Sequence, residues 1–344
     1  MSPDAADVSG PSPELLFDTL NAYQRSEALK TALELDIFTA IGAGQQTAAD
    51  LGGSCQAAPR GVEILADYLT SLGFLSKQGN RYALTPSSEA FLNRNSPAYM
   101  GDTRTFLLSS MLRENFGRLT ESVRNGGALP EHSSVSPDNP CWVEFARSMG
   151  GMMAMPAQMI AKKLGVASLG KMNVLDIAAG HGVFGITMAQ HNPQAVITAL
   201  DWPGVLEVAR ENAVQAGVAE RYITISGDAF GVDFQGDWKD HFDVVLLPNF
   251  LHHFDRATCV AFLKKLHGVL RPGGLVAMLE FIPNEDRISP APAARFSLIM
   301  LATTSSGNAY TWKEYQGMYR EAGFSHAEMQ QMLPSPEQLV IAQV

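Results

Sequence analysis

The chain has 344 residues, of which 46% are hydrophobic and 17% are charged, and its formal net charge is −10. This composition predicts a compact globular protein and excludes a disordered chain. The acidic balance argues against nucleic-acid binding, which usually needs a basic surface. The three cysteines lie far apart and show no CxxC or zinc spacing, so we expect a cytoplasmic protein without disulfides and without a bound metal.

The chain begins with a segment, residues 1–13, that is acidic and rich in proline and serine. We expect it to form a disordered tail and not a signal peptide. No run of 18 apolar residues occurs, so no contact with a membrane is expected. From Leu15 to Ile41 the pattern is helix-like throughout, with apolar residues on more than one stripe. Covering that much apolar surface would need a partner subunit.

A second helix is predicted from Arg60 to Leu72, followed by a β-hairpin that turns at Gly79-Asn80. Two helices and a hairpin are the layout of a winged helix, which often binds DNA. Residues 14–95 carry nine acidic and six basic side chains, however. The helix that would enter the major groove carries Glu63 and Asp67, which is unfavourable beside phosphates. The charge therefore favours a dimerisation domain.

Residues 96–165 are expected to form a mainly helical connector. From Asn173 onward, strands and helices alternate, which predicts a doubly wound, mostly parallel sheet in residues 166–344. A capping box at Thr311 and Glu314 opens the last helix. Two strands follow it without an intervening helix, so we expect a closing antiparallel hairpin. The fold class is therefore α/β, preceded by a mostly α-helical domain.

The loop after the first strand of this sheet is the candidate cofactor site. Gly180-His-Gly182-Val-Phe-Gly185 matches GxGxxG, and Asp201 lies 21 residues after Gly180, at the end of the next strand. This spacing also satisfies the dinucleotide fingerprint, so an NAD(P)-dependent oxidoreductase is an alternative. In either case the glycines let the backbone approach the ligand closely.

Further acids favour S-adenosylmethionine over a dinucleotide. Asp176 ends the first strand, where a carboxylate would face a pyrophosphate badly but would attract the methionyl ammonium. Asp228 ends the third strand and could accept a hydrogen bond from the adenine amino group. Asp201 could bind both ribose hydroxyls. Three acids at successive strand ends therefore predict S-adenosylmethionine, with S-adenosylhomocysteine as the product.

Together these segments resemble the small-molecule O-methyltransferases of the plant caffeate and bacterial polyketide or hydroxyindole type. The family's DxGGGxG reads DIAAGHG here, Asp-Leu-Pro reads Asp201-Trp-Pro203, and Gly-Asp-Met-Phe reads Gly227-Asp-Ala-Phe230. The resemblance covers nearly the whole chain. It implies a homodimer built through a winged-helix domain, a Rossmann-like class I methyltransferase domain and a role in secondary metabolism. The cofactor residues that it implies are Asp176, Ala178, Gly180, Gly182, Asp201, Trp202, Gly227, Asp228, Ala229, Phe230 and Asn249.

The resemblance also assigns catalytic roles. The family's Leu-His-Asp-Trp-x-Asp matches Leu251 to Arg256 and places His252 on the catalytic base, while Glu280 matches the acid that holds this histidine. A phenol, with a pKa of about 10, needs a base at neutral pH, and histidine is suited to that task. His253 competes for the role of base.

The sequence departs from the plant pattern in two places near this histidine. Ala309 stands where the family often has a second glutamate, and His253 replaces the acid after the catalytic histidine. A His–Glu–Glu trio is thus reduced to a pair, which leaves room for another acceptor or for catalysis dominated by proximity. The resemblance implies an acceptor pocket lined by Phe145, Met149, Met152, His253, Met300 and Asn308.

These observations predict transfer of a methyl group to a hydroxyl of a small aromatic or polyketide-like acceptor. An N- or C-methyltransferase on the same scaffold is the main alternative. A regulator that binds the cofactor without catalysis is another. The residues name neither the acceptor nor the pathway.

Overall fold

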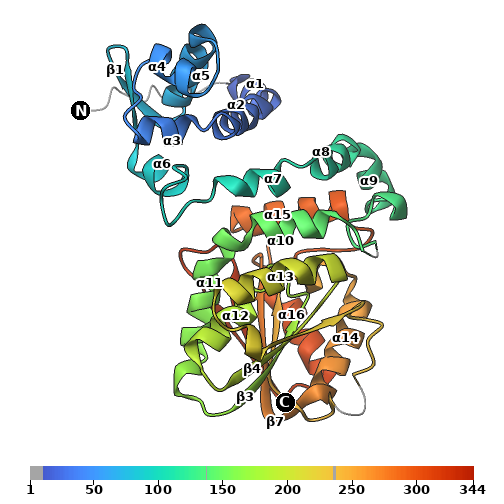
Figure 1. The fold of residues 1–344 in the computed structure, drawn as a ribbon. Coiled ribbons are helices and arrows are strands. Elements are labelled where there is room, and N and C mark those ends of the chain that lie inside the picture. Colours follow the sequence, from blue (N-terminus) through green and yellow to red (C-terminus); the bar gives the residue numbers. More distant parts are fainter. Residues whose placement is uncertain (1–10, 137, 235–237) are drawn as a thin grey trace, which may run out of the picture. The chain divides into compact units, whose positions relative to one another are not determined.

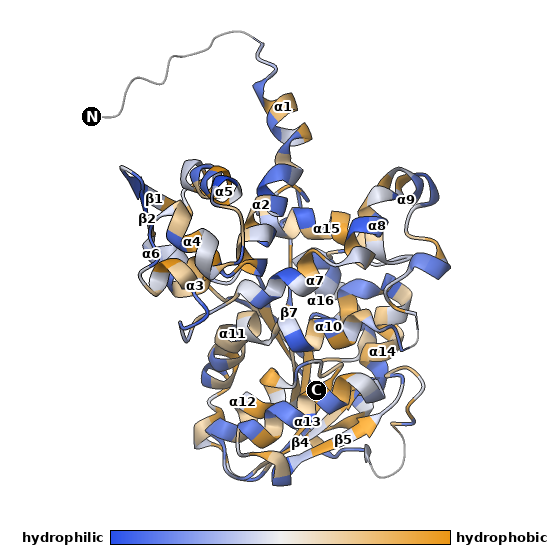
Figure 2. Ribbon diagram, turned by 45° about the horizontal axis from the view of Figure 1, so that its top comes forward, coloured by the Kyte–Doolittle hydropathy of each residue, from blue (hydrophilic) through white to orange (hydrophobic). Residues whose placement is uncertain are grey.

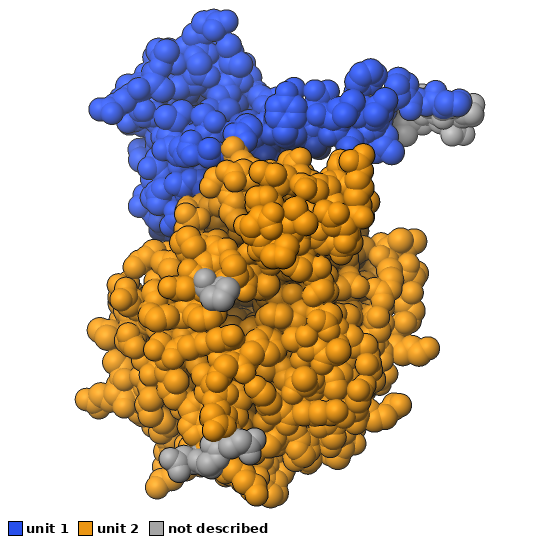
Figure 3. All heavy atoms as spheres, turned by 90° about the vertical axis from the view of Figure 1, so that its right-hand side faces the viewer, with its two compact units in different colours: residues 1–104 blue, residues 105–344 orange. Residues whose placement is uncertain are grey.

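The computed structural model describes residues 11–136, 138–234 and 238–344. The chain divides into two compact units, residues 1–104 and 105–344 (Figure 3). Most of the expected N-terminal tail lies outside the described residues, and most of the expected connector, 96–165, falls in the second unit. Within the described ranges, no helix is both long enough and apolar enough to cross a bilayer.

Unit 1 is a helical domain with one β-hairpin. Its elements are α1 (Glu14–Leu20), α2 (Ala22–Glu34), α3 (Ile37–Gly42), α4 (Ala48–Ser54), α5 (Pro59–Ser71), β1 (Leu75–Gln78), β2 (Arg81–Leu84) and α6 (Pro86–Phe91). β1 and β2 pair antiparallel around Gly79, which adopts φ +61°, as the sequence predicts. Phe38, Leu51, Leu69 and Tyr82 are buried in its core.

The helical pattern from Leu15 to Ile41 is interrupted twice. α1 ends at Leu20, and Asp36 adopts φ +52° between α2 and α3. Aspartate tolerates the left-handed conformation better than most residues, because its short side chain can form local hydrogen bonds. The chain therefore turns where hydrophobic periodicity alone gives no signal.

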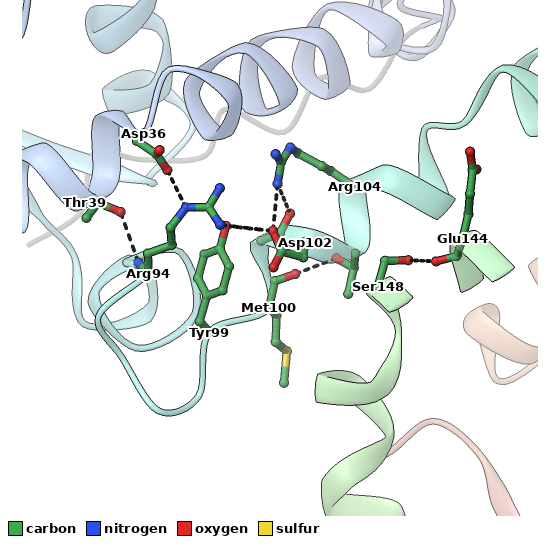
Figure 4. Close-up of polar contacts among 11 residues, drawn as sticks. Asp36, Thr39, Arg94, Tyr99, Met100, Asp102, Arg104, Glu144 and Ser148 are labelled. Atoms are coloured by element: carbon green, nitrogen blue, oxygen red, sulfur yellow. Dashed lines mark hydrogen bonds and ion pairs between the residues drawn. The ribbon is translucent and has the colours of Figure 1, made fainter. Parts of the chain in front are cut away.

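A polar network ties the end of unit 1 to α3 (Figure 4). The Arg94 guanidinium donates to Asp36 at 2.8 Å and to Asp102 at 3.3 Å, and it lies 5.2 Å from the ring centre of Tyr99. The backbone N–H of Arg94 donates to the Thr39 hydroxyl at 3.1 Å. These contacts explain why the compact unit continues past the last helix of the domain to residue 104.

Unit 2 opens with helices and continues with a seven-stranded sheet. The helices before the sheet are α7 (Arg104–Leu107), which spans the division, α8 (Ser110–Gly117), α9 (Leu119–Asn125), α10 (Cys141–Ser148) and α11 (Gly150–Lys163). The strands are β3 (Met172–Ile177), β4 (Ala195–Asp201), β5 (Tyr222–Ser226), β6 (Phe242–Pro248), β7 (Leu270–Glu280), β8 (His326–Gln331) and β9 (Gln338–Gln343).

The strand order is β5-β4-β3-β6-β7-β9-β8. The first five strands in this order are parallel, while β9 runs antiparallel to both β7 and β8. This arrangement confirms the predicted α/β class and the closing hairpin. The predicted capping box also forms at Thr311 and Glu314.

Helices cover both faces of the sheet (Figure 1). One face packs against α11, α12 (Val183–His191) and α13 (Pro203–Gln215). The other packs against α14 (Arg256–Val269) and α16 (Trp312–Ala322), and α15 (Ala291–Thr303) lies between β7 and α16 in the chain. Side chains alternate between the faces of a strand. Leu175 and Ile177 therefore face α14 and α16, while Val174 and Asp176 face α12.

The strand order of the sheet indicates a binding site at the carboxyl ends of its central strands. From β3 the chain adds β4 and β5 on one side, and it later adds β6 and β7 on the other side. Ligands of open α/β sheets bind beyond the carboxyl ends of the strands where the order reverses. That position lies beyond β3 and β6, where the glycine loop and the segment Asn249 to His253 follow their strands.

Candidate active site

The glycine loop after β3 has the backbone conformation that its sequence suggests. Ala178, Gly180 and Gly182 adopt φ values of +50°, +57° and +74°. A Cβ on Gly182 would lie 2.7 Å from the hydroxyl of Tyr222. Only glycine adopts such positive φ values at little cost, and here it also avoids a steric clash. The loop thus presents backbone to the site with no side chain at these glycines.

Asp201 is held against this loop by its backbone. One carboxylate oxygen accepts a hydrogen bond from the N–H of Gly180 at 2.8 Å, and the other accepts from Trp202 at 2.7 Å. Burial raises the pKa of Asp201 to about 6, against the opposing effect of these two bonds. The structure thus brings together three predicted cofactor residues, and each carboxylate oxygen keeps a lone pair that fits a sugar hydroxyl.

Asp176 lies beneath the loop and is fully buried. Its Oδ2 accepts a hydrogen bond from the N–H of Gly185 at 3.0 Å, and its Oδ1 is buried with no partner. Burial raises the pKa of this carboxyl well above its usual value. The unpartnered oxygen is suited to accept a hydrogen bond from an N–H donor such as an ammonium group. The contact between Asp176 and the cofactor remains a prediction.

The segment after β5 contains the residues that are predicted to lie beside the adenine. The N–H of Gly227 donates to the carbonyl of Asp201 at 3.0 Å, which joins this turn to the end of β4. Asp228 is exposed, and its Oδ1 accepts from the N–H of Phe230 at 2.9 Å. Ala229 is buried, and the ring of Phe230 stacks on Phe250 with centroids 5.9 Å apart.

Asn249 directly follows β6 and adopts φ +53°. Its side-chain amide donates to Glu337 at 2.9 Å, and its Oδ1 is buried without a partner. Burial raises the pKa of Glu337. No pattern in the sequence points to Glu337, because 88 residues separate it from Asn249 and no motif joins them.

The candidate base and its acid are brought into contact by the pairing of β6 and β7. These strands are parallel neighbours, so their carboxyl ends meet. Glu280 is the last residue of β7, and His252 lies in the short 3₁₀ turn Leu251–His253 beyond β6. His252 Nδ1 and Glu280 Oε2 are 2.5 Å apart, and both side chains are buried. Glu280 Oε1 also accepts from the N–H groups of Phe250 and His252.

Burial sets the protonation of this pair. It lowers the pKa of His252 to about 3 and raises the pKa of Glu280 to about 8. Burial disfavours the charged form of each group. The pair therefore holds two protons between about pH 3 and pH 8. Above pH 8 it loses one of them and becomes able to accept a proton.

His253 extends the pair. Its Nε2 lies 3.2 Å from Nε2 of His252, and its Nδ1 is shielded from solvent with no partner. Burial and the neighbouring His252 lower the pKa of His253 well below the usual value. Glu280, His252 and His253 thus form a continuous row of titratable groups.

Aromatic rings connect this row to the cofactor loop. Trp142 meets His253 edge-on with centroids 5.2 Å apart, and it meets Phe145 at 5.8 Å. Phe145 stacks on His181 of the glycine loop at 5.9 Å and an angle of 20°. Trp142 and Phe145 are three residues apart on α10 and so share one helix face. That spacing could have revealed Trp142, which the sequence analysis missed.

The other predicted acceptor residues lie in different environments. Met149 and Met300 are buried. Met152 is partly buried and packs against the core on the side of the sheet that α11, α12 and α13 cover. Asn308 donates its backbone N–H to the carbonyl of His252 at 2.8 Å. The ring of Phe296, on α15, lies 4.7 Å from that of His252, and no sequence signal had pointed to it.

Gly307 and Ala309 explain how the loop before α16 fits against the histidine. A Cβ at Gly307 would lie 2.4 Å from the carbonyl oxygen of His252, so this position excludes a side chain. Ala309 is fully buried and supplies no second carboxylate. Across the part of the chain that the structure describes, no group of three or more His, Cys, Asp or Glu side chains is arranged to hold a metal ion.

Comparison with known proteins identifies the family. The O-methyltransferase domain model matches residues 129–325, and the O-methyltransferase dimerisation domain model matches residues 17–94. The chain therefore belongs to the O-methyltransferase family, and the prediction of an O-methyltransferase is confirmed. Family members use S-adenosylmethionine, which also confirms the predicted cofactor against the dinucleotide alternative.

Individual relatives align over nearly the full length. The 3-hydroxy-5-methyl-1-naphthoate 3-O-methyltransferase of Streptomyces sahachiroi is 28% identical, with 91% of this chain and 90% of the relative covered. The tetracenomycin polyketide synthesis 8-O-methyl transferase TcmO of Streptomyces glaucescens is also 28% identical, with 92% of each covered. A crystal structure from Nostoc punctiforme PCC 73102, described as an O-methyltransferase, is 49% identical with a TM-score of 0.91, and the match covers 97% of this chain and 100% of that one.

Proposed function

We propose that this O-methyltransferase methylates a hydroxyl of a small aromatic or polyketide-like molecule, with the His252–Glu280 pair as the proton acceptor. The observation that carries the proposal is the 2.5 Å contact between these two buried side chains. It lies at the carboxyl ends of β6 and β7, on the same edge of the sheet as the glycine loop. Two full-length relatives, a naphthoate and a tetracenomycin methyltransferase, support the class of acceptor.

The reaction needs a positioned acceptor and a place for its proton. Bound S-adenosylmethionine supplies a methyl group on a positively charged sulfur. The bond from the acceptor oxygen to the methyl carbon forms as the carbon–sulfur bond breaks, and the hydroxyl proton passes to the histidine pair. Glu280 stabilises the imidazolium that results, because opposite charges attract strongly where water is excluded.

The remaining predicted residues take binding roles in this proposal. Asp201 binds the ribose hydroxyls, Asp176 Oδ1 the ammonium group and Asp228 the adenine amino group. Ala178, Gly180, Gly182, Trp202, Gly227, Ala229, Phe230 and Asn249 complete the cofactor site. Phe145, Met149, Met152, Met300 and Asn308 surround the acceptor. Flat aromatic acceptors suit this wall, because rings stack and meet edge-on favourably.

A substitution of the base tests the proposal. His252→Ala should lower turnover by on the order of 10²- to 10⁴-fold, because a positioned general base contributes about that much. Binding of S-adenosylhomocysteine, measured by calorimetry, should persist. His326→Ala is the matched control, because the His326 side chain is 62% exposed on β8. Full activity of His252→Ala would refute the role of the pair.

A screen identifies the acceptor and separates the alternatives. Methyl-labelled cofactor is offered with phenols, hydroxynaphthoates, quinones and cell extract, and the product is analysed by mass spectrometry and NMR. A new O–CH₃ group is expected. A new N–CH₃ or C–CH₃ group would instead show an N- or C-methyltransferase on the same scaffold, in which the base need not act.

We also propose that the enzyme is a homodimer formed through unit 1, which matches the dimerisation model. α1 has no buried residue, and it exposes Leu15, Leu16, Phe17 and Leu20. Hydrophobic residues colour part of this helix in Figure 2. A groove of about 430 Å³ lies nearby between α2 and α5, lined by Tyr23, Gln24, Glu27, Gly61, Ile64, Leu65 and Tyr68. Apolar surface of this extent on one small domain marks a protein interface.

Charge placed on α1 tests this interface. The double variant Leu16→Asp with Leu20→Asp should shift the protein from dimer to monomer in analytical ultracentrifugation. Leu333→Asp is the control, because Leu333 is also exposed but lies in unit 2. A dimer that persists in the double variant would contradict the assignment of this face.

Four further properties that the sequence predicts are part of the same proposal. They are the winged-helix nature of unit 1, the cytoplasmic location, the role in secondary metabolism and the lack of a nucleic-acid partner. The excess of acidic side chains in residues 14–95 supports the last point. Salt-sensitive binding to duplex DNA would contradict it, because phosphate contacts release counterions.

A further inference from the structure

The hydrogen bonds of the row Glu280–His252–His253 fix which nitrogen carries each proton. Above about pH 8, Glu280 is a carboxylate that accepts two backbone N–H groups, so Nδ1 of His252 donates to it. A neutral imidazole has a single N–H, and therefore Nε2 of His252 is an acceptor. It lies 3.2 Å from Nε2 of His253, which must then be the donor.

This assignment leaves His253 Nδ1 as a bare acceptor. The atom is shielded from solvent and has no hydrogen-bond partner among the residues that the structure describes. Its surroundings are apolar, with Trp142 edge-on at 5.2 Å and Phe254 at 6.2 Å between ring centroids. A buried acceptor without a partner is unfavourable, and such atoms in native proteins usually await a ligand or serve catalysis. A hydroxyl is a donor that would satisfy it.

The lone pair of His252, by contrast, is already engaged. The rings of His253 and Phe296 lie against that of His252, with centroids 4.2 Å and 4.7 Å away. The carbonyl of His252 is held by the backbone N–H of Asn308, and Gly307 packs directly against it. A hydroxyl could reach Nε2 of His252 only by displacing His253, whose N–H would then lose its partner.

We propose that His253 Nδ1 is the atom that removes the acceptor's proton, and that His252 and Glu280 receive it through a relay. This inference rests on the proposed function, because it specifies the path of the same proton. The acceptor O–H bond breaks as a bond from Nδ1 of His253 to hydrogen forms. The proton on Nε2 of His253 passes to Nε2 of His252, and the oxygen electron pair attacks the methyl carbon while the carbon–sulfur bond breaks.

The relay places the positive charge where it is stabilised. His253 ends neutral with its proton on the other nitrogen, and His252 ends as an imidazolium beside the Glu280 carboxylate. In the described ranges, no hydrogen bond or ion pair joins His253 to a carboxylate, so a charge left on His253 would lie against the ring of Trp142. Because His253 removes the proton and His252 carries the charge, a histidine at position 253 has a role that explains why it replaces the acid of the family pattern.

Substitutions of His253 test the relay. His253→Phe keeps an aromatic ring at this position. His253→Gln can keep a donor toward His252, and His253→Asn can keep a polar atom toward the acceptor. None of the three side chains can pass a proton between two nitrogens. Single-turnover methyl transfer is measured at pH 9 with 3-hydroxy-5-methyl-1-naphthoate as the probe. All three variants should lose on the order of tenfold in rate, because about a tenth of a hydroxyl with a pKa of about 10 is already ionised at pH 9. Binding of S-adenosylhomocysteine should be unchanged, and His326→Gln should match the wild type.

A second acceptor distinguishes proton transfer from packing. The 4-nitro derivative of the same naphthoate is already ionised at pH 9, so it needs no base. The deficit of the His253 variants should shrink to a few-fold with this acceptor, whereas a packing defect would slow both acceptors equally. A wild-type rate in His253→Phe, or an equal deficit with both acceptors, would overturn the relay. A loss in His252→Ala would still support the proposed function in that case.

The tautomers are measured without any acceptor. In protein labelled with ¹⁵N-histidine and saturated with S-adenosylhomocysteine at pH 9, Nδ1 of His253 should be unprotonated and its Nε2 protonated. A proton on Nδ1 of His253 at this pH would overturn the relay whatever the acceptor. Failure of the wild type to methylate either naphthoate would count against the proposed acceptor class alone, and this spectrum would still decide the relay.

Discussion

Replacing the carboxylate of Glu280 by an amide is the sharpest test of the site. Glu280→Gln preserves shape but alters the partner of His252 Nδ1. An amide can present its NH₂ group there, because its oxygen continues to accept the N–H groups of Phe250 and His252. His252 would then carry its proton on Nε2, which is the wrong nitrogen for a base. In serine proteases the analogous change lowers kcat about 10⁴-fold. We expect a loss of on the order of 10²- to 10⁴-fold here.

The same substitution should not destabilise the fold at neutral pH. Burial raises the pKa of Glu280 from its usual value of 4.5 to about 8. A raised pKa contributes stability below pH 4.5, and that contribution is lost as pH rises to 8. One pKa unit corresponds to about 1.4 kcal/mol, so the loss reaches roughly 5 kcal/mol at high pH. Glutamine does not titrate. The free energy of unfolding of the variant should therefore increase relative to that of the wild type as pH rises from 4.5 to 8.

Two measurements check this reasoning together. Single-turnover rates report catalysis, and urea unfolding at pH 5, 7 and 8.5 reports stability. The wild-type rate should rise with pH and level off above about 8, because the pair loses its extra proton there. His252 contacts Glu280, and the other titratable groups that its charge affects are Cys259, Tyr315, Tyr319 and Glu337. A Glu280→Gln enzyme with wild-type rate would refute the tautomer argument, and a rate that falls through pH 8 would refute the protonation argument.

Backbone positions and the cofactor acid give three further expectations. Gly182→Ala should destabilise the fold and weaken binding of S-adenosylhomocysteine by calorimetry, because its Cβ would lie 2.7 Å from a tyrosine hydroxyl. Gly165→Ala, also at positive φ but in open space, should cost about 1–2 kcal/mol and leave binding intact. Gly307→Ala should lower kcat with little effect on cofactor affinity, because it would push the carbonyl of His252 away; unchanged kcat would show that this contact is not needed. Asp201→Asn should weaken cofactor binding about tenfold or more, because the charge-assisted bonds to the ribose are lost; unchanged affinity would remove Asp201 from the site.

The sequence alone determined the fold class, and it predicted where on the sheet the site lies. The alternation of strands and helices after Asn173 predicts the sheet, because buried parallel strands need continuous apolar runs. The spacing of Gly180, Gly182 and Asp201 predicts the cofactor loop, because a close backbone approach and a strand-end carboxylate leave a local signature. These features depend on residues near one another in the chain, so one sequence suffices to read them.

The tertiary structure decided which distant side chains meet. Glu337 reaches Asn249, and Phe296 reaches His252, through strand order and helix packing that no local pattern encodes. The break at Asp36 was hidden for a related reason, since a contact with Arg94, 58 residues away, accompanies it. His253 shows the distinction best. Its sequence position made it a competitor of His252, but the 3.2 Å contact between their Nε2 atoms makes the two rings consecutive members of one row.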